Sequence, residues 1–332
     1  MPLSPDALST AAVAVLPTAG QRTAAVLGLG AALPPTVIAS DEVAARIGKE
    51  PGWIERRTGI ETRRRLQPGE SMTTLAAEAA TAALEDAGVA AEDLDVVIAA
   101  TTQGDDLLPN LAPQVAARIG ARNAGASDVG AACAGFVAGL PMAAAMIETG
   151  RADRVLLIGA DALSRFLDHD DPVTAALFGD GAGAIVLGPS DGEGAIGPVL
   201  VRSDGDRGGL VGIPGHQGPI AMDGHGTFLG AIANLSAATA DVVARAGLEL
   251  ADIDLFVYHQ ANRRILAGIA ERLGIDADRV VDAIAHAGNT SAASLPLALD
   301  AARRDGRLRP GARVLLGAVG SGFTWGAGVV TW

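Results

Sequence analysis

The sequence predicts an α/β protein whose sheets are largely buried. Short, continuous apolar runs indicate buried strands, and alanine-rich stretches that end at glycine indicate helices. The two kinds of segment alternate along the chain, which is the pattern of an α/β fold. In addition, 49% of the 332 residues are hydrophobic and 19% are charged, so the chain has enough apolar material for a large core in two halves.

The first half contains strands and helices with recognisable boundaries. Ser40 is the expected N-cap of a short helix, and Gly88 and Gly120 are expected to end two longer ones. The predicted strands are 23–29, 95–101, 154–159 and 182–187, and the predicted longer helices are 73–87, 111–119 and 137–147.

The second half continues the alternation and contains a weak internal repeat. In each half a helix ends at a glycine and is followed by a strand that begins with aspartate. The residues are Gly88 and Asp95 in the first half and Gly247 and Asp254 in the second, which indicates duplication of one unit. The predicted elements are a strand at 197–203, a glycine-rich loop at 205–218, helices at 227–246, 262–273 and 294–304, and strands at 254–258 and 313–319.

Composition narrows the class of protein. Cys133 is the only cysteine, so no intramolecular disulfide is possible, and we expect a cytoplasmic protein. The net charge of −13 argues against general nucleic-acid binding. We expect no apolar run to approach the roughly 18 residues of a membrane span. Residues 1–22 contain three prolines and are interpreted as a flexible extension.

Four polar segments follow predicted strands, at the sheet edge where open α/β proteins place their sites. The first carries Cys133 in a small-residue turn before a helix, where the backbone N–H groups and the helix dipole favour a thiolate nucleophile. A small buried side chain is the alternative interpretation of a lone cysteine. The other three contain His259, Asn289 and Ser321.

A Cys–His–Asn set is suited to acyl-transfer chemistry. A thiolate at Cys133 attacks an acyl thioester, and donors from His259 and Asn289 stabilise an enolate oxygen. The backbone N–H groups of Cys133 and Ser321 are the candidate oxyanion hole. Residue types alone also allow His259 to be structural. No histidine, cysteine or carboxylate spacing predicts a metal site.

Several motifs in order resemble the β-ketoacyl-acyl carrier protein synthase III family of the thiolase superfamily. The resemblance runs from about residue 24 to the C-terminus. The motifs are Ala131-Ala132-Cys133-Ala134-Gly135-Phe136, Phe178-Gly179-Asp180-Gly181-Ala182-Gly183-Ala184, His259-Gln260-Ala261-Asn262, Gly288-Asn289-Thr290-Ser291-Ala292-Ala293-Ser294, Trp53-Ile54-Glu55-Arg56-Arg57-Thr58-Gly59-Ile60 and Phe323-Thr324-Trp325-Gly326.

The resemblance implies a duplicated five-layer α/β/α/β/α thiolase fold, with one half at 23–190 and the other at 191–332, and a homodimer. It implies that an acyl-CoA primer acylates Cys133 and that His259 and Asn289 promote decarboxylative condensation with a malonyl carrier protein, with acyl-CoA as a substrate and no cofactor. Further positions match by family role: Trp53 and Arg57 for CoA, Arg263 and Arg264 for carrier-protein docking, and Leu108 for the partner subunit's acyl pocket.

The chain also departs from the family pattern. Pro172 stands where many members have an arginine opposite the adenine, and no basic residue follows Phe228. The loop from 207 to 219 looks shortened, and Ser321 replaces the central glycine of a three-glycine turn. These departures concern the binding of CoA and the carrier protein, whereas Cys133, His259 and Asn289 match the family. The leading hypothesis is a condensing enzyme. A non-condensing acyltransferase with the same acyl-cysteine is the alternative, and a structural subunit without activity is a third.

Overall fold

The computed structural model describes residues 22–190, 195–216 and 218–332. The predicted N-terminal extension at 1–22 lies outside the described residues except for Arg22.

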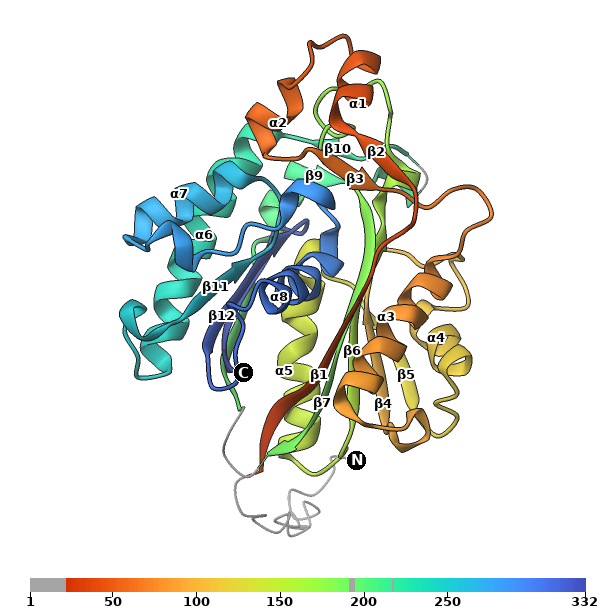
Figure 1. The fold of residues 1–332 in the computed structure, drawn as a ribbon, viewed down its shortest axis with the longest axis vertical. Helices are drawn as coiled ribbons and strands as arrows, with labels where there is room; N and C mark the ends of the chain where they lie inside the picture. Colours follow the sequence, from red (N-terminus) through yellow and green to blue (C-terminus); the bar gives the residue numbers. More distant parts are fainter. Residues whose placement is uncertain (1–21, 191–194, 217) are drawn as a thin grey trace, which may run out of the picture.

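A five-stranded sheet forms the frame of the first half (Figure 1). Its strand order is β1-β7-β6-β4-β5, with β4 parallel to both β5 and β6 and with antiparallel pairs at β6–β7 and β7–β1. The continuous apolar runs of β4, β6 and β7 therefore do form buried strands, whereas β5 has no buried residue. The strands are β1 Thr23–Ala32, β4 Val96–Ala100, β5 Gly125–Val129, β6 Val155–Ala162 and β7 Asp180–Ser190.

The second half repeats this sheet. Its strand order is β8-β13-β12-β11, with antiparallel pairs at β8–β13 and β13–β12 and a parallel pair at β12–β11. Val280 adds a parallel bridge to Phe256 of β11, in the place that β5 has in the first sheet. The two halves thus share strand order and direction. The strands are β8 Ile196–Ser203, β11 Leu255–Tyr258, β12 Arg313–Gly320 and β13 Thr324–Thr331.

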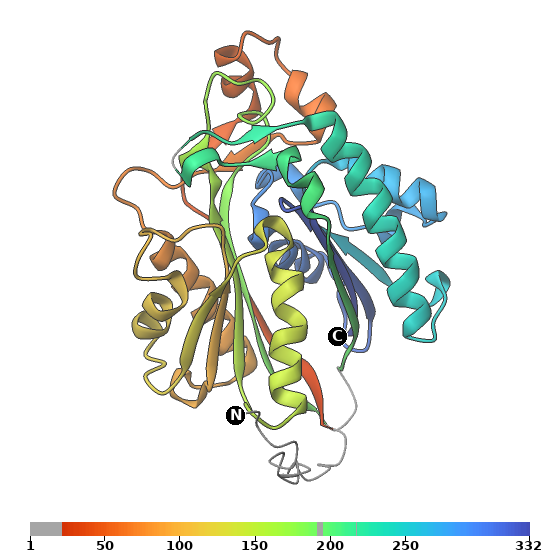
Figure 2. The same ribbon diagram turned by 180° about the vertical axis from the view of Figure 1, so that it is seen from behind.

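Helices complete a five-layer α/β/α/β/α arrangement (Figures 1 and 2). Helices α5 (Gly135–Glu148) and α8 (Ser294–Arg304) lie between the sheets and pack on strands of both. Helices α3 (Met72–Ala87) and α4 (Leu111–Ile119) cover the outer face of the first sheet. Helix α6 (Gly224–Arg245) covers the second sheet and packs against α7 (Arg263–Leu273).

Smaller elements cap the edge of the sheets where the site lies. They are α1 Ser40–Arg46, α2 Trp53–Thr58, the β2 Val37–Ala39 and β3 Thr62–Arg64 pair, and the β9 Val211–Gly212 and β10 Ala221–Met222 pair. Figure 1 shows them above the two main sheets.

Most predicted helix ends match the structure. Gly88 and Gly120 take left-handed conformations directly after α3 and α4, where a Cβ would be strained. The expected N-cap at Ser40 is wrong: Ala39 precedes α1, and the Ser40 hydroxyl instead donates to the carbonyl of Ile60 at 2.5 Å. Strand β13 was not predicted as a strand.

Among the described residues, one helix, α6, is long and apolar enough to cross a membrane by length and composition. The expectation that no run approaches that length was wrong. The apolar character of α6 has a local explanation, because residues such as Leu235 and Val242 are buried against the second sheet.

Candidate active site

The nucleophile candidate lies where the carboxyl ends of the first sheet's parallel strands meet. Ala100 at the end of β4 pairs with both Val129 of β5 and Gly159 of β6, so β4 and β5 end at one level and β6 continues to Ala162. After β5 the chain makes a single turn at Ala132–Ala134 and enters α5. Ala132 has a positive φ of 46°, an uncommon conformation for a residue with a Cβ. Cys133 therefore lies at a helix start, as the sequence indicated.

The electrostatic environment of Cys133 differs from the expectation. The pKa of the Cys133 thiol is raised to about 12, mainly by burial and also by the nearby charge of Asp161, whereas the Ser291 hydroxyl and the backbone N–H of Cys133 oppose the rise. The residue keeps some exposure to the pocket, but its sulfur is densely surrounded. The expectation of a stabilised thiolate in the free protein was therefore wrong, because burial outweighs the helix start.

His259 follows β11 and is only 2% exposed. Its backbone N–H donates to the carbonyl of Gly317 at 2.7 Å, which fixes the residue against β12. Burial lowers the pKa of His259 to about 4, so the imidazole is neutral at pH 7 and can donate one N–H. Within the described part of the chain, its Nδ1 atom has no hydrogen-bond partner.

The neighbouring Gln260 is structural. Its side-chain amide donates to the carbonyls of Tyr258 and Val281, and its Oε1 accepts from the N–H of Ala283 at 2.7 Å. Because the side-chain amide of Gln260 is hydrogen-bonded to backbone groups, the residue holds neighbouring segments together. Of His259 and Gln260, only His259 lines the pocket.

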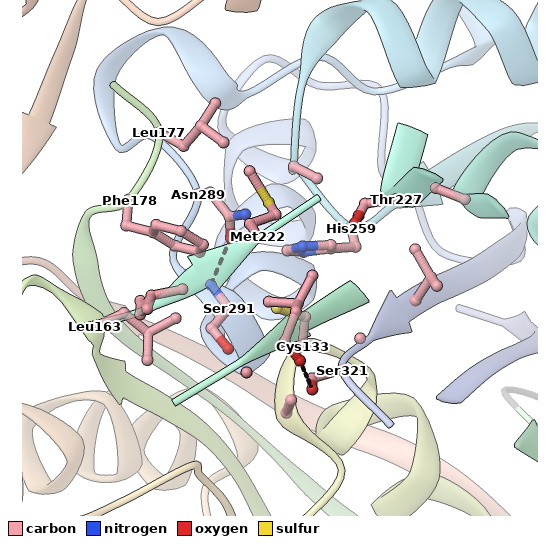
Figure 3. A pocket seen from close by; sticks show the side chains of 18 of the residues that line it. Cys133, Leu163, Leu177, Phe178, Met222, Thr227, His259, Asn289, Ser291 and Ser321 are labelled. Carbon is pink, nitrogen blue, oxygen red and sulfur yellow. Dashed lines mark hydrogen bonds between the residues drawn. The ribbon is translucent and has the colours of Figure 1, made fainter. Parts of the chain in front are cut away.

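Asn289 is held by its own loop. Its backbone N–H donates to Leu177 and its carbonyl accepts from Gly179, both at 3.0 Å, and its Oδ1 accepts from the N–H of Ser291 at 3.0 Å. Since the oxygen is engaged, the Nδ2 group is the end of the amide that remains for a ligand. Figure 3 shows Asn289, His259 and Cys133 around the same pocket.

The turn between β12 and β13 closes the site next to Cys133. A Cβ at Gly320 would lie 2.8 Å from the backbone nitrogens of both Cys133 and Ala134. Only glycine allows so close an approach, and it brings the Ser321 turn against the helix start that carries Cys133. The Ser321 hydroxyl donates to the carbonyl of Val211, which fastens the turn to β9.

These groups line one cavity of about 350 Å³. Cys133, His259 and Asn289 are among its polar lining residues, and the walls are predominantly apolar. An apolar cavity with a few convergent polar groups is typical of a small-molecule site. The apolar walls include Leu163, Phe166, Leu177, Phe178, Val211, Ile213, Ile220, Met222, Phe228 and Phe323.

Trp53 and Arg57 lie together on α2, outside this cavity's lining. The Arg57 guanidinium stacks 4.5 Å from the centre of the Trp53 ring, and Lys49 lies 5.4 Å from the same centre. The Trp53 indole, on the exposed helix α2, therefore has two cationic side chains, Arg57 and Lys49, beside it. Pro172 lies in a loop that the Arg46–Asp170 ion pair (2.8 Å) fastens to α1.

The two arginines at the start of α7 differ. Arg263 is paired with Asp282 at 2.5 Å, so its charge is already matched. Arg264 is exposed, and its guanidinium donates to the carbonyl of Arg56 at 3.2 Å near the end of α2. Among the described residues no carboxylate pairs with Arg264, which makes it the better of the two candidates for an acidic partner.

Leu108 does not line its own chain's cavity and is 79% exposed, beside Leu107 at 75%. His286 is also a surface residue, with its side chain 4.0 Å from Glu61. In the described residues no group of His, Cys, Asp or Glu side chains has metal-binding geometry.

Two residues beside Cys133 were not recognised from the sequence as part of the site. Ser291, at φ 54°, faces Cys133, and the buried Asp161 lies behind both. Ser291 belongs to a motif that the sequence did single out, whereas Asp161 follows an apolar strand and carries no local signal.

A duplicated five-layer fold with a cysteine at a buried helix start and a facing His–Asn pair defines the class of thiolase-fold acyl-transfer enzymes. The family models agree: residues 127–205 match 3-oxoacyl-[acyl-carrier-protein] synthase III, and residues 243–332 match the C-terminal part of the same family.

Known relatives span nearly the whole chain. β-Ketoacyl-[acyl-carrier-protein] synthase III 2 of Streptomyces coelicolor is 45% identical over 315 residues, which is 94% of this chain and 95% of the relative. The synthase III of Rhodospirillum centenum is 44% identical, over 92% of this chain and 98% of the relative. The protein therefore belongs to the β-ketoacyl-acyl carrier protein synthase III family.

Solved structures give the same result. The 3-oxoacyl-(acyl carrier protein) synthase III of Pseudomonas aeruginosa superposes with a TM-score of 0.90 at 42% identity, over 94% of this chain and 98% of that one. A priming β-ketosynthase from a polyketide biosynthetic pathway superposes with a TM-score of 0.89 at 35% identity, over 94% and 96%. The thiolase-like fold expected from the resemblance is thus confirmed.

Proposed function

We propose that this enzyme starts fatty-acid or polyketide chains by condensing an acyl-CoA primer with a malonyl carrier protein. The observation that carries the proposal is the convergence of Cys133, His259 and Asn289 on one apolar cavity in a member of the synthase III family. Acyl-CoA is a substrate in this scheme, and the protein acts in the cytoplasm.

In the first half-reaction the Cys133 sulfur attacks the thioester carbon of acyl-CoA. A carbon–sulfur bond to Cys133 forms, the bond to the CoA sulfur breaks, and the thiol proton ends on the departing CoA thiolate. The N–H groups of Cys133 and Ser321 stabilise the tetrahedral oxyanion. Because the free thiol has a pKa of about 12, its proton leaves only as the attack proceeds.

In the second half-reaction the malonyl thioester binds with its carbonyl oxygen facing His259 and Asn289. The carboxylate leaves as carbon dioxide, and the electron pair moves into an enolate whose oxygen accepts from the neutral imidazole N–H and the Asn289 amide. The enolate carbon attacks the acyl carbon, Cys133 departs as a thiolate, and a proton from solvent restores the thiol. Asn289 is the residue that favours condensation over simple acyl transfer.

Substrate docking uses the surface above the cavity. Trp53 offers a face for the adenine and Arg57 a charge for a CoA phosphate, with Lys49 beside them. Arg264, and to a lesser degree the paired Arg263, are the proposed contacts of an acidic carrier protein.

The working unit is proposed to be a homodimer. Strand β5 is at one edge of the five-stranded sheet, and the apolar Leu107 and Leu108 are exposed in the loop before α4. An open strand edge and exposed leucines are what a partner subunit would cover. In that arrangement Leu108 enters the partner subunit's acyl pocket, and sedimentation of the purified protein tests the dimer.

One experiment separates the candidate functions. The protein is incubated with acyl-CoA, its intact mass is measured, and malonyl carrier protein is then added. A single adduct that is absent in Cys133→Ala, followed by a ketoacyl product and carbon dioxide, supports the proposal. An adduct that passes only to another acceptor identifies a non-condensing acyltransferase, and no adduct at all would contradict both. An adduct that survives Cys133→Ala would overturn the assignment of the nucleophile.

A further inference from the structure

Arg63 is a buried arginine that the proposed reaction does not use. It lies in β3, is 0% exposed, and forms no ion pair among the described residues. Its Nε and Nη1 atoms have no hydrogen-bond partner in the part of the chain that the structure describes. A buried cation without a counterion is costly, and an apolar side chain could fill the same space. The contacts that Arg63 does make therefore indicate its role.

The remaining nitrogen of Arg63 joins two segments. Its Nη2 donates to the Ser40 hydroxyl at 3.1 Å and to the carbonyl of Ala176 at 3.0 Å. Ser40 is the first residue of α1, whereas Ala176 directly precedes Leu177 and Phe178, which line the cavity. A hydrogen bond from a charged guanidinium is stronger than one between neutral groups. Arg63 thus fixes the main chain one residue before the cavity wall.

The segment that follows Ala176 is paired with the loop that carries Asn289. The backbone N–H of Asn289 donates to the carbonyl of Leu177, and the N–H of Gly179 donates to the carbonyl of Asn289, both at 3.0 Å. Phe178 and Asn289 form a parallel bridge, and Figure 3 shows them next to each other at the pocket. The main chain of Asn289 is therefore held by the segment that Arg63 bonds.

The base of the Arg63 side chain lies against both partners of this pairing. A Cβ at Gly179 would lie 3.1 Å from the Arg63 Cβ, and one at Gly288 would lie 3.3 Å from it. Gly288 directly precedes Asn289. The two segments also touch main chain to main chain, since a Cβ at Gly179 would lie 2.2 Å from the carbonyl oxygen of Ala287. Arg63 therefore supports the Asn289 loop by packing as well as by hydrogen bonding.

We propose that Arg63 is a positioning residue for Asn289. Its guanidinium holds the Ala176 carbonyl and its stem supports Gly179 and Gly288, so the backbone pairing at Asn289 stays formed. The Nδ2 group of Asn289 then stays where it can donate to the enolate oxygen. The inference rests on the proposed function only in assigning Asn289 to the decarboxylation step.

The test measures the two half-reactions separately in Arg63→Met, which keeps most of the stem and removes every donor. Carbon dioxide release from malonyl carrier protein is expected to fall about tenfold to a hundredfold, because a small displacement of a catalytic group has an effect of this size. Acylation of Cys133 at saturating acyl-CoA is expected to be retained, since the hydrogen bonds of Arg63 do not reach the Cys133 turn. A loss of folded protein would instead lower both half-reactions together. Equal losses in both, or parental carbon dioxide release from a folded Arg63→Met protein, would overturn the proposal.

Arg279→Met is the matched control. Arg279 also donates to main-chain carbonyls, those of Leu250 at 2.6 Å and Ala251 at 3.3 Å, and it does not line the cavity. Both half-reactions of this variant are expected to match those of the parent. The same selective loss of carbon dioxide release in Arg279→Met would overturn the proposal, because it would show that any such arginine has this effect.

Arg63→Lys decides the question if Arg63→Met does not fold. Lysine keeps the charge, but it is shorter and lacks the planar donor group that reaches both Ser40 and Ala176. Carbon dioxide release is expected to lie between that of the parent and that of a variant without a donor. Parental release from Arg63→Lys would refute the role of the guanidinium.

Amide hydrogen exchange separates this inference from the proposed function, because it needs no substrate. Peptides that cover 176–180 and 284–292 are expected to exchange about tenfold faster in Arg63→Lys than in the parent, and at the parental rate in Arg279→Met. Unchanged exchange in Arg63→Lys would refute the proposal. A parent enzyme that releases no carbon dioxide would refute the proposed condensation, whereas faster exchange in the variant would still support the hold of Arg63 on the Asn289 loop.

Discussion

At Cys133 the helix start favours the thiolate and burial opposes it. The larger of these two effects decides whether the sulfur is protonated. A helix start favours an anion by about 0.3–1 kcal/mol, or about 2 kcal/mol in favourable buried geometry. A rise from an ordinary thiol pKa to about 12 corresponds to a penalty on the order of 4 kcal/mol for the thiolate. Burial therefore prevails in the free protein, and the nucleophile is a thiol that loses its proton during attack.

His259→Ala and Asn289→Ala are expected to retain acylation of Cys133 and to lose most of the decarboxylation step. Both side chains line the cavity in which the proposed enolate forms, and loss of one oxyanion donor costs about 10²–10³ in rate. Acyl-enzyme mass and carbon dioxide release, measured separately, show the difference. Condensation at the parental rate in either variant would remove that residue from the mechanism.

His259 also makes stability depend on pH. Its pKa is about 4 in the folded protein and about 6.5 in an unfolded chain, so the unfolded state binds more protons between these values. The stability due to the neutral, buried imidazole is complete above about pH 6.5 and is lost as the pH falls towards 4, by up to about 3 kcal/mol. Denaturant unfolding at pH 7 and pH 5 is expected to show a smaller loss for His259→Gln. An equal loss would assign the effect to other groups.

At the scale of elements, the turn between β12 and β13 shows how two halves of a duplicated fold make one site. Strand β13 was missed because Gly326 and Gly328 weaken its strand pattern. Gly326 has a tertiary reason: a Cβ there would lie 2.6 Å from the carbonyl of Leu200 in β8. The glycines allow close strand pairing, and that pairing carries the Ser321 turn to the Cys133 helix start.

Gly320→Ala is expected to impair both half-reactions. The new Cβ would lie 2.8 Å from the backbone nitrogens of Cys133 and Ala134, so the turn must move away and the oxyanion hole opens. We expect at least about a hundredfold loss in acylation and about 1–3 kcal/mol of stability. Gly209→Ala, at an exposed position of the short 3-10 helix Gly205–Leu210 where a Cβ meets nothing within 4 Å, serves as control and is expected to keep full acylation. Normal acylation of Gly320→Ala would show that the turn does not form the oxyanion hole.

At the scale of the whole molecule, net charge opposes the proposed partner. The chain carries −13 and carrier proteins are acidic, so long-range repulsion must be overcome by a local basic surface. The surface at the start of α7 and the end of α2 contains Arg264, which has no carboxylate partner among the described residues, and Arg57 beside Trp53. Arg263 contributes less because Asp282 neutralises it.

Arg264→Glu is expected to slow reaction with malonyl carrier protein far more than self-acylation from acyl-CoA. The difference should shrink at high salt, since the charges are exposed and screened over about 10 Å at 0.1 M. Arg272→Glu, at the opposite end of α7, makes the same change in net charge and is expected to affect neither half-reaction strongly. If both variants slow the carrier-protein step equally, net charge rather than a docking surface is responsible.

The sequence by itself determined the alternation of strands and helices, most element boundaries and the three residues that meet in the cavity. Local patterns carry that information: apolar runs, glycine helix ends and short polar motifs after strands. Tertiary structure alone decided the protonation of Cys133 and His259, the engagement of Arg263 by Asp282 and the place of Asp161 behind the nucleophile. Each of these depends on burial or on contact between residues distant in sequence, and no local pattern records either.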